Sequence, residues 1–168
     1  MRKYAFMAVV TTLMWLCSPI SAHAQKLVFV VRHAERADGG MMQAQKDPPL
    51  SAAGQVRASK LAVLLGEAGI KGVYATEYRR TQETARPLAT KLGLQPQQVS
   101  SDDIDGLLRK IRSEHAQDFV LIVGHSNTVP AIIKALGGPD VTIPDNEYDN
   151  LFLVVPGTGV MTKIKYTP

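Results

Sequence analysis

Two histidines in the sequence follow strand-like apolar segments. His33 comes after the Val-rich run 26–31, and His125 comes after the apolar run 119–123. Arginines stand near the ends of predicted strands as well, at positions Arg32 and Arg80. The planar arginine fork suits phosphate oxygens, and histidine can act as nucleophile, acid or hydrogen-bond donor near neutral pH. Together these residues predict an anion site, and phosphate is the anion that they suit best.

The elements that must position these residues alternate between strand and helix. Strands are predicted at 26–31, 73–75, 98–100 and 119–123, helices at 52–68, 79–92, 102–115 and 127–136, and a terminal hairpin at 150–155 and 160–166. This order predicts an α/β fold, a three-layer α/β/α sandwich with a mostly parallel central sheet. Ligands of such folds bind outside the carboxyl ends of the strands, where both histidines are expected.

Helical spacing also predicts which side chains are buried. In the first helix the apolar face is expected to hold Val56, Leu61, Leu64 and Leu65, with Ser51 as the N-cap. A solvated position is expected for His115, and Arg36, Arg79 and Arg86 are expected to be surface charges, with a place in the pocket lining as the alternative for Arg36. The segment 147–150 is interpreted as a turn, with the rim of the pocket as the alternative, and Met41-Met42 as loop filler or a lid.

An export leader precedes the predicted domain. Arg2 and Lys3 give a positive start, residues 4–16 form a short apolar stretch, and Ala22-His23-Ala24 is an A-x-A cleavage site. We expect residues 1–24 to be a signal peptide and residues 25–168 to be the mature domain. That arrangement predicts a secreted protein of a bacterial periplasm, without a membrane contact after cleavage. An uncleaved membrane anchor is the alternative.

Composition narrows the function classes. A chain of 168 residues is the length of one domain, and its single cysteine, Cys17, excludes an intrachain disulfide and a cysteine-based zinc site. Loss of Arg2 and Lys3 with the leader would lower the formal charge of +4 by two. Because no basic stripe with interleaved aromatic residues is present, no nucleic acid is expected as a partner. Nothing in the sequence indicates an obligate protein partner.

Four motifs, in order, resemble those of the histidine phosphatase superfamily, which includes the phosphoglycerate-mutase-like enzymes. They are the R-H-A-E segment at 32–35, the L-S-A-A-G segment at 50–54, the V-Y-A-T-E-Y-R-R-T-Q-E-T-A segment at 73–85 and the V-G-H-S segment at 123–126. The resemblance covers roughly residues 26–136. Because the chain is short and begins with a leader, it is similar to a short, secreted member of the phosphohistidine-phosphatase type.

The resemblance implies a role for each matched residue. His33 would be the nucleophile that forms a phosphohistidine, and Arg32, Arg80 and His125 would surround the phosphoryl oxygens. It also implies a metal-independent phosphomonoester hydrolase without a cofactor. The substrate would be a phosphorylated small molecule, with sugar phosphates among the possibilities.

The sequence departs from the family pattern in several places. Ala34 stands for the usual glycine, and Ala75, Thr76 and Glu77 replace two serines and a proline. The stretch between the third and fourth motifs is short and lacks the insertion that carries a general acid in mutase members. Candidates for that acid are Glu35, Asp102 and Asp103.

Two further functions stay open at this level. One is a metal-dependent hydrolase with His33 and His125 as ligands, although dense carboxylate or histidine spacing is missing. The other is a non-catalytic periplasmic module that binds phosphorylated sugars in the same pocket.

Overall fold

A computed structural model describes residues 27–37 and 47–167 of the chain. The expected leader and the Met41-Met42 pair lie outside this part. The elements are β1 (Leu27–Arg32), α1 (Ala52–Leu65), β2 (Ile70–Thr76), α2 (Arg79–Leu92), β3 (Gln97–Val99), α3 (Ile104–Glu114), β4 (Phe119–Gly124), α4 (Thr128–Ala135), β5 (Asn150–Val155) and β6 (Val160–Lys165). The predicted order of strands and helices is therefore confirmed.

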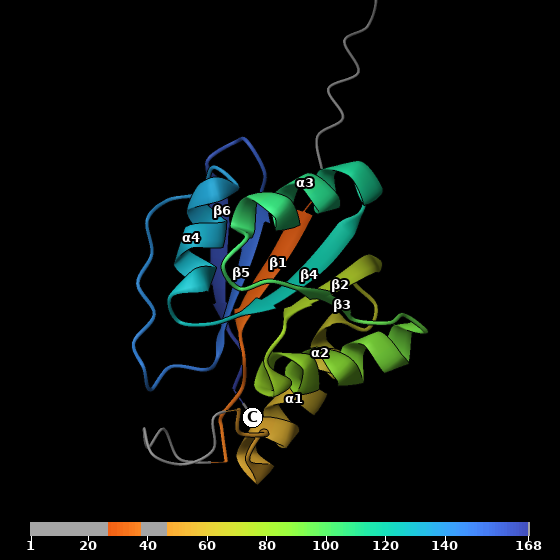
Figure 1. The fold of residues 1–168 in the computed structure, drawn as a ribbon, viewed down its shortest axis with the longest axis vertical. Coiled ribbons are helices and arrows are strands. Elements are labelled where there is room, and N and C mark those ends of the chain that lie inside the picture. Colours follow the sequence, from red (N-terminus) through yellow and green to blue (C-terminus); the bar gives the residue numbers. More distant parts are fainter. Residues whose placement is uncertain (1–26, 38–46, 168) are drawn as a thin grey trace, which may run out of the picture.

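The six strands form one sheet in the order β3-β2-β4-β1-β5-β6 (Figure 1). The strands β3, β2, β4 and β1 run parallel, while β5 runs antiparallel to both of its neighbours. In the centre, Arg32 at the end of β1 pairs in register with Gly124 at the end of β4. This register places His33 and His125, the next residue of each chain segment, at the same edge of the sheet.

Helices cover both faces of the sheet, which confirms the predicted three layers. Alternate residues of β1 point to opposite faces because side chains of a strand have a period of two. Val28 and Val30 pack in the core beneath α3 and α4, and Phe29 and Val31 pack in the core beneath α1 and α2. In Figure 1 the two helix pairs lie on either side of the sheet. Within residues 27–37 and 47–167, no helix has the length and apolar character that a membrane crossing needs.

The predicted apolar face of α1 is wrong at two positions. Leu61 and Leu65 are buried, but Val56 and Leu64 are each 50% exposed. Three of the six buried residues of this helix are small. The buried residues are Gly54, Arg57, Ala58, Leu61, Ala62 and Leu65. Ser51 caps the helix as predicted, because its side chain accepts a hydrogen bond from Gly54 N.

The expectation of a solvated His115 is also wrong. Its ring lies against Gly72, packs edge-on against Tyr74 at 5.9 Å between ring centroids, and bonds through Nδ1 to Asp118 at 3.0 Å. It sits at the C-cap of α3, beside the chain that leads into β4. Because Gly72 of β2 has no side chain, the His115 ring has room beside it. His115 therefore covers the core at the end of the sheet opposite to the strand ends that carry His33 and His125.

Candidate active site

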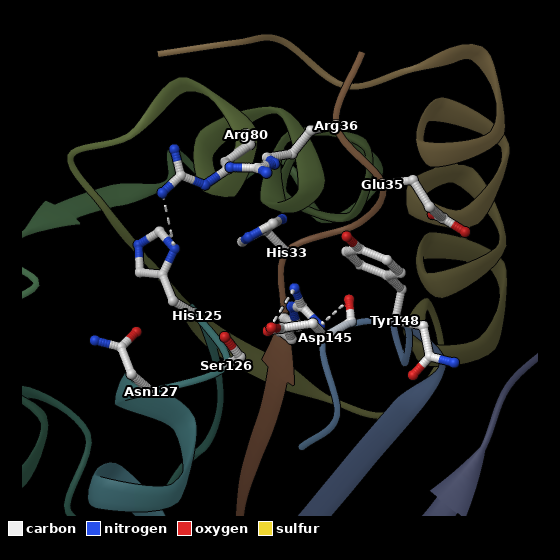
Figure 2. A pocket seen from close by; sticks show the side chains of 11 residues that line it. His33, Glu35, Arg36, Arg80, His125, Ser126, Asn127, Asp145 and Tyr148 are labelled. Carbon is white, nitrogen blue, oxygen red and sulfur yellow. Dashed lines mark hydrogen bonds and ion pairs between the residues drawn. The ribbon is translucent and has the colours of Figure 1, made fainter. Parts of the chain in front are cut away.

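An open cavity of about 710 Å³ lies at the carboxyl ends of the central strands. Its described lining comes from the ends of β1 and β4, the start of α2 and α4, and the loop between α4 and β5 (Figure 2). The lining residues are Arg32, His33, Glu35, Arg36, Arg80, His125, Ser126, Asn127, Asp145, Asn146 and Tyr148. All four site residues predicted from the sequence, Arg32, His33, Arg80 and His125, are brought together there.

The His33 imidazole is held in one tautomer. Its Nδ1 lies 2.8 Å from the carbonyl oxygen of Ala34, which can only accept a hydrogen bond, so Nδ1 carries the proton. The lone pair is then on Nε2. The backbone at this position is fixed as well, because His33 N donates to Gly124 O at 2.9 Å. A buried ring with one fixed lone pair is the form that a nucleophilic histidine needs.

Two helices hold the loop that carries His33. From α2, Thr84 Oγ1 accepts a hydrogen bond from Ala34 N at 3.0 Å. From the start of α1, Ser51 N donates to Glu35 O at 2.9 Å. The contact with α1 is close: a Cβ on Gly54 would lie 2.3 Å from Glu35 O. The second and third sequence motifs thus act on the first one by fixing its backbone.

His125 is held through its other nitrogen. Arg80 Nη2, which can only donate, lies 3.3 Å from Nδ1, so the proton of the neutral ring is on Nε2. That Nε2–H donates to Thr76 Oγ1 at 2.8 Å. The ring centroids of His33 and His125 are 5.3 Å apart, with an angle of 63° between the planes. Figure 2 shows Arg80 joined to His125, with the His33 ring beside the pair.

Both histidines are neutral in the folded protein at pH 7. The pKa of His33 is lowered to about 3, mainly by burial; His125, Arg80 and Arg32 act in the same direction, and the hydrogen bond to Ala34 opposes them. Burial lowers the pKa of His125 to about 4, and Arg80 contributes in the same direction. A phosphate in the cavity would oppose these effects, since a nearby negative charge favours the protonated ring.

Arg32 links the sheet to the loop after α4. Its Nη1 donates to the carbonyl oxygens of Pro144, Asp145 and Glu147 at 2.9–3.1 Å. The Tyr148 ring covers the guanidinium, with 4.2 Å between Cζ and the ring centroid. The Nε–H is buried and has no hydrogen-bond partner among the described residues.

Arg80 is oriented by three groups. Besides His125, it contacts Asp47, with 3.6 Å between Nη1 and Oδ1, and the Tyr78 ring, with 4.3 Å between Cζ and the centroid. Asp47 in addition accepts hydrogen bonds from Arg79 N at 3.0 Å and so caps the start of α2. Arg79 itself turns outward to Glu83, as expected for a surface charge.

The N-terminus of α4 also faces the cavity. Asn127 is the N-cap, and its side chain makes no capping hydrogen bond. Asn127 and Ser126 both line the cavity. The free N–H groups and the dipole at a helix N-terminus favour an anion, so this end adds to the positive potential around the histidines.

None of the acids considered from the sequence is poised beside His33. Both Glu35 oxygens are bound by Arg57 at 2.6–3.0 Å, and in Figure 2 the carboxylate points toward α1 and away from His33. Burial alone would raise the pKa of Glu35, but the hydrogen bonds and charge of Arg57 hold it below its usual value. Asp103 caps α3, and neither it nor Asp102 is among the described lining residues.

Sequence reasoning missed part of the described lining. Arg36 was expected to be a surface charge, but it lines the cavity. Tyr148 was interpreted as part of a turn, and the structure instead supports the alternative of a pocket rim. Asp145 and Asn146 had no signal at all, because they reach the site only through the carbonyl contacts of their loop with Arg32. The position of Arg36 directly after the R-H-A-E motif was the one available hint.

Few side chains of the described residues are arranged to bind a metal ion. Among residues 27–37 and 47–167, no group of three His, Cys, Asp or Glu side chains is arranged to hold an ion. The nitrogens of the two histidines are engaged by Ala34, Thr76 and Arg80, apart from Nε2 of His33.

Solved structures share this fold. The protein histidine phosphatase SixA, solved with tungstate, is 19% identical with a TM-score of 0.61, over 82% of this chain and 94% of that one. A candidate alpha-ribazole-5′-P phosphatase from Escherichia coli is 14% identical with a TM-score of 0.67, over 86% and 97%. The mycobacterial glucosyl-3-phosphoglycerate phosphatase with inorganic phosphate is 15% identical with a TM-score of 0.62, over 84% and 96%.

At these identities the likeness establishes the fold, which is the phosphoglycerate-mutase-like one. No protein of curated function matches the sequence at a significant level. In the sequence itself, residues 28–104 match the model of the histidine phosphatase superfamily, branch 1. That match includes the segments of His33 and Arg80, which stand in the cavity described above. Residues 28–104 are thus similar in sequence to the histidine phosphatase superfamily, and the described chain shares its fold with solved phosphatases.

Proposed function

We propose that this protein is a phosphatase, namely an exported, metal-independent phosphomonoesterase that works through a phosphohistidine on His33. The observation that carries the proposal is the joint geometry of the site. A buried neutral imidazole with its lone pair on Nε2 lies 5.3 Å from a second imidazole, centroid to centroid, and shares its cavity with Arg32 and Arg80. The relatives named above include phosphatases of small phosphorylated molecules.

In the first step, the Nε2 lone pair of His33 attacks phosphorus, an N–P bond forms, and the ester P–O bond breaks. Charge in phosphoryl transfer is spread over the three equatorial oxygens, so catalysis depends on positioning and electrostatic stabilisation. Arg32 and Arg80 can donate to these oxygens. His125 becomes a donor once the bound phosphate raises its pKa and Nδ1 takes up a proton. These three side chains supply the positive charge that a metal ion would otherwise contribute.

In the second step, water attacks phosphorus, the N–P bond breaks, and inorganic phosphate leaves with His33 restored. Of the carboxylates in the described lining, Glu35 is bound by Arg57 and the Asp145 side chain is 97% exposed. The leaving oxygen therefore takes its proton from water that enters the open cavity. This favours substrates whose leaving group needs little protonation, such as aryl phosphates.

Export is proposed from the leader, whose charged start, apolar stretch and A-x-A site are those of a secretory signal. The measurement is N-terminal sequencing of the protein recovered from outside the cytoplasm. A chain that begins at Gln25 supports export with cleavage. A chain that still begins at Met1 would show that the leader is kept.

The central experiment is turnover of p-nitrophenyl phosphate with and without EDTA, together with trapping of an acid-labile phosphoenzyme. We expect turnover that survives EDTA and a phosphoenzyme that is lost in His33→Ala. Arg79→Ala is the matched control because its side chain points away from the cavity. Vanadate binding without turnover would favour the phosphosugar-binding module, and turnover abolished by EDTA and restored by a metal would favour the metal-dependent hydrolase.

A further inference from the structure

A third arginine lines the cavity beyond the phosphate site. Arg36 lies three residues after His33, and its side chain extends toward the cavity from the side of Arg80 (Figure 2). Its charge is felt at the site: the pKa of Arg32 is lowered first by burial, and the positive charge of Arg36 lowers it further.

The backbone of Arg36 is fixed. It forms an isolated antiparallel bridge with Leu50. Hydrogen bonds flank the bridge on both sides, from Ser51 N to Glu35 O and from Ala37 N to Pro49 O, both at 2.9 Å. Leu50 N in turn donates to Glu83 Oε2 of α2 at 2.8 Å. The side chain therefore starts from a rigid point at the mouth of the cavity, which lowers the entropy that a ligand contact costs.

The phosphoryl group has enough partners without Arg36. Its three equatorial oxygens are already faced by Arg32, Arg80, His125 and the N-terminus of α4. A cavity of about 710 Å³ is also far larger than one phosphate, and it is the size of a site for a whole small molecule.

We propose that Arg36 binds a second anionic group of the substrate, a carboxylate or a second phosphate, carried by the part that leaves. This inference rests on the proposed function and narrows it to phosphomonoesters with an acidic leaving group. The guanidinium fork suits either anion, because both offer two oxygens to its parallel N–H groups.

The test compares phenyl phosphate, 4-carboxyphenyl phosphate and hydroquinone bisphosphate in the purified protein and in Arg36→Gln, Arg36→Lys and Arg79→Gln. We expect Arg36→Gln to lower kcat/KM for one or both acidic substrates by about 10- to 100-fold and for phenyl phosphate by no more than about twofold. Which acidic substrate responds distinguishes carboxylate from phosphate. Arg36→Lys should keep most of the preference because it keeps the charge, and Arg79→Gln should behave as the parent.

Equal losses on all three substrates, together with weaker vanadate inhibition, would overturn the proposal by placing Arg36 in the phosphoryl site. Unchanged kinetics on every substrate would overturn it as well. If the parent protein turns over none of the esters, the proposed function fails, and the subsite is then tested by calorimetric binding of phenylphosphonate against 4-carboxyphenylphosphonate and 1,4-phenylenediphosphonate. Tighter binding of either acidic phosphonate that disappears in Arg36→Gln supports the subsite, and equal binding of all three rejects it.

Discussion

His33 and His125 lie 5.3 Å apart between ring centroids, and protein oxygens hold them through different nitrogens, Nδ1 of His33 and Nε2 of His125. The two rings consequently offer different atoms to a phosphate, Nε2 from the first and Nδ1 from the second. One ring can attack phosphorus while the other contacts an equatorial oxygen. Neither can exchange its role by rotation without losing a buried hydrogen bond.

The low pKa values of the two histidines can be measured directly. With folded values of about 3 and about 4, both rings stay neutral as the pH falls well below the usual pKa of 6.5. We expect NMR titration of the ring nitrogens to show neutral His33 and His125 at pH 5, and addition of vanadate to raise the pKa of His125. His33→Asn and His125→Asn assign the signals. Two rings that titrate near 6.5 would contradict the buried, cation-flanked geometry.

Thr76→Val removes the acceptor of His125 Nε2 with little change in volume. Thr76 is buried, so the N–H would lose its partner at a cost of about 1–3 kcal/mol and the ring would lose its fixed tautomer. We expect kcat/KM for p-nitrophenyl phosphate to fall by about 10-fold or more. Thr76→Ser keeps the hydroxyl and should retain activity within a few fold. If Thr76→Val and Thr76→Ser both kept a kcat/KM close to that of the parent, the hydrogen bond from His125 Nε2 would not be needed.

Arg32→Lys tests whether the guanidinium fork is needed. An ammonium group cannot hold the carbonyl oxygens of residues 144–147 and also present two parallel donors to phosphate. We expect kcat/KM to fall by about 10²–10³, the effect of losing one preorganised donor to the transition state. Arg79→Lys, at an exposed position, is the control. Full activity in Arg32→Lys would show that Arg32 contributes only its positive charge and that the guanidinium fork is not needed.

Arg57→Ala should destabilise the fold through Glu35. The pair is largely buried, with 2.6 Å between Arg57 Nη2 and Glu35 Oε1, and its loss should cost about 2–4 kcal/mol at pH 7. Burial raises the pKa of Glu35 but Arg57 lowers it more, so the pair stabilises the protein fully above the unfolded pKa of about 4.5 and loses this effect as the pH falls through the lowered folded value.

Urea unfolding at several pH values measures this difference. The gap between parent and Arg57→Ala should narrow below about pH 4, where Glu35 takes up its proton. Lys110→Ala removes an exposed ion pair of α3 and should have little effect on the free energy of unfolding at any pH. A gap that does not change with pH would mean that Arg57 acts by packing and not by its charge.

Much of the fold and the four main site residues could be predicted because the information is local. Buried parallel strands appear as continuous apolar runs, and β1 and β4 carry Arg32, His33 and His125 directly at their ends. The wrong positions depend on contacts distant in sequence. Val56 and Leu64 are exposed because α2 packs on the small residues of α1, and Tyr148 enters the site because Arg32 holds the carbonyl oxygens of its loop. No local pattern records either contact.

The contact between Gly54 and the carbonyl oxygen of Glu35 gives the L-S-A-A-G segment a meaning that helix propensity does not. A methyl group at position 54 would lie 2.3 Å from that oxygen and would push apart two backbones that also share the hydrogen bond from Ser51. Since Glu35 is two residues from His33, the displacement would extend to the loop that carries the proposed nucleophile. The missing side chain of Gly54 thus lets α1 lie directly against the backbone that holds the His33 ring.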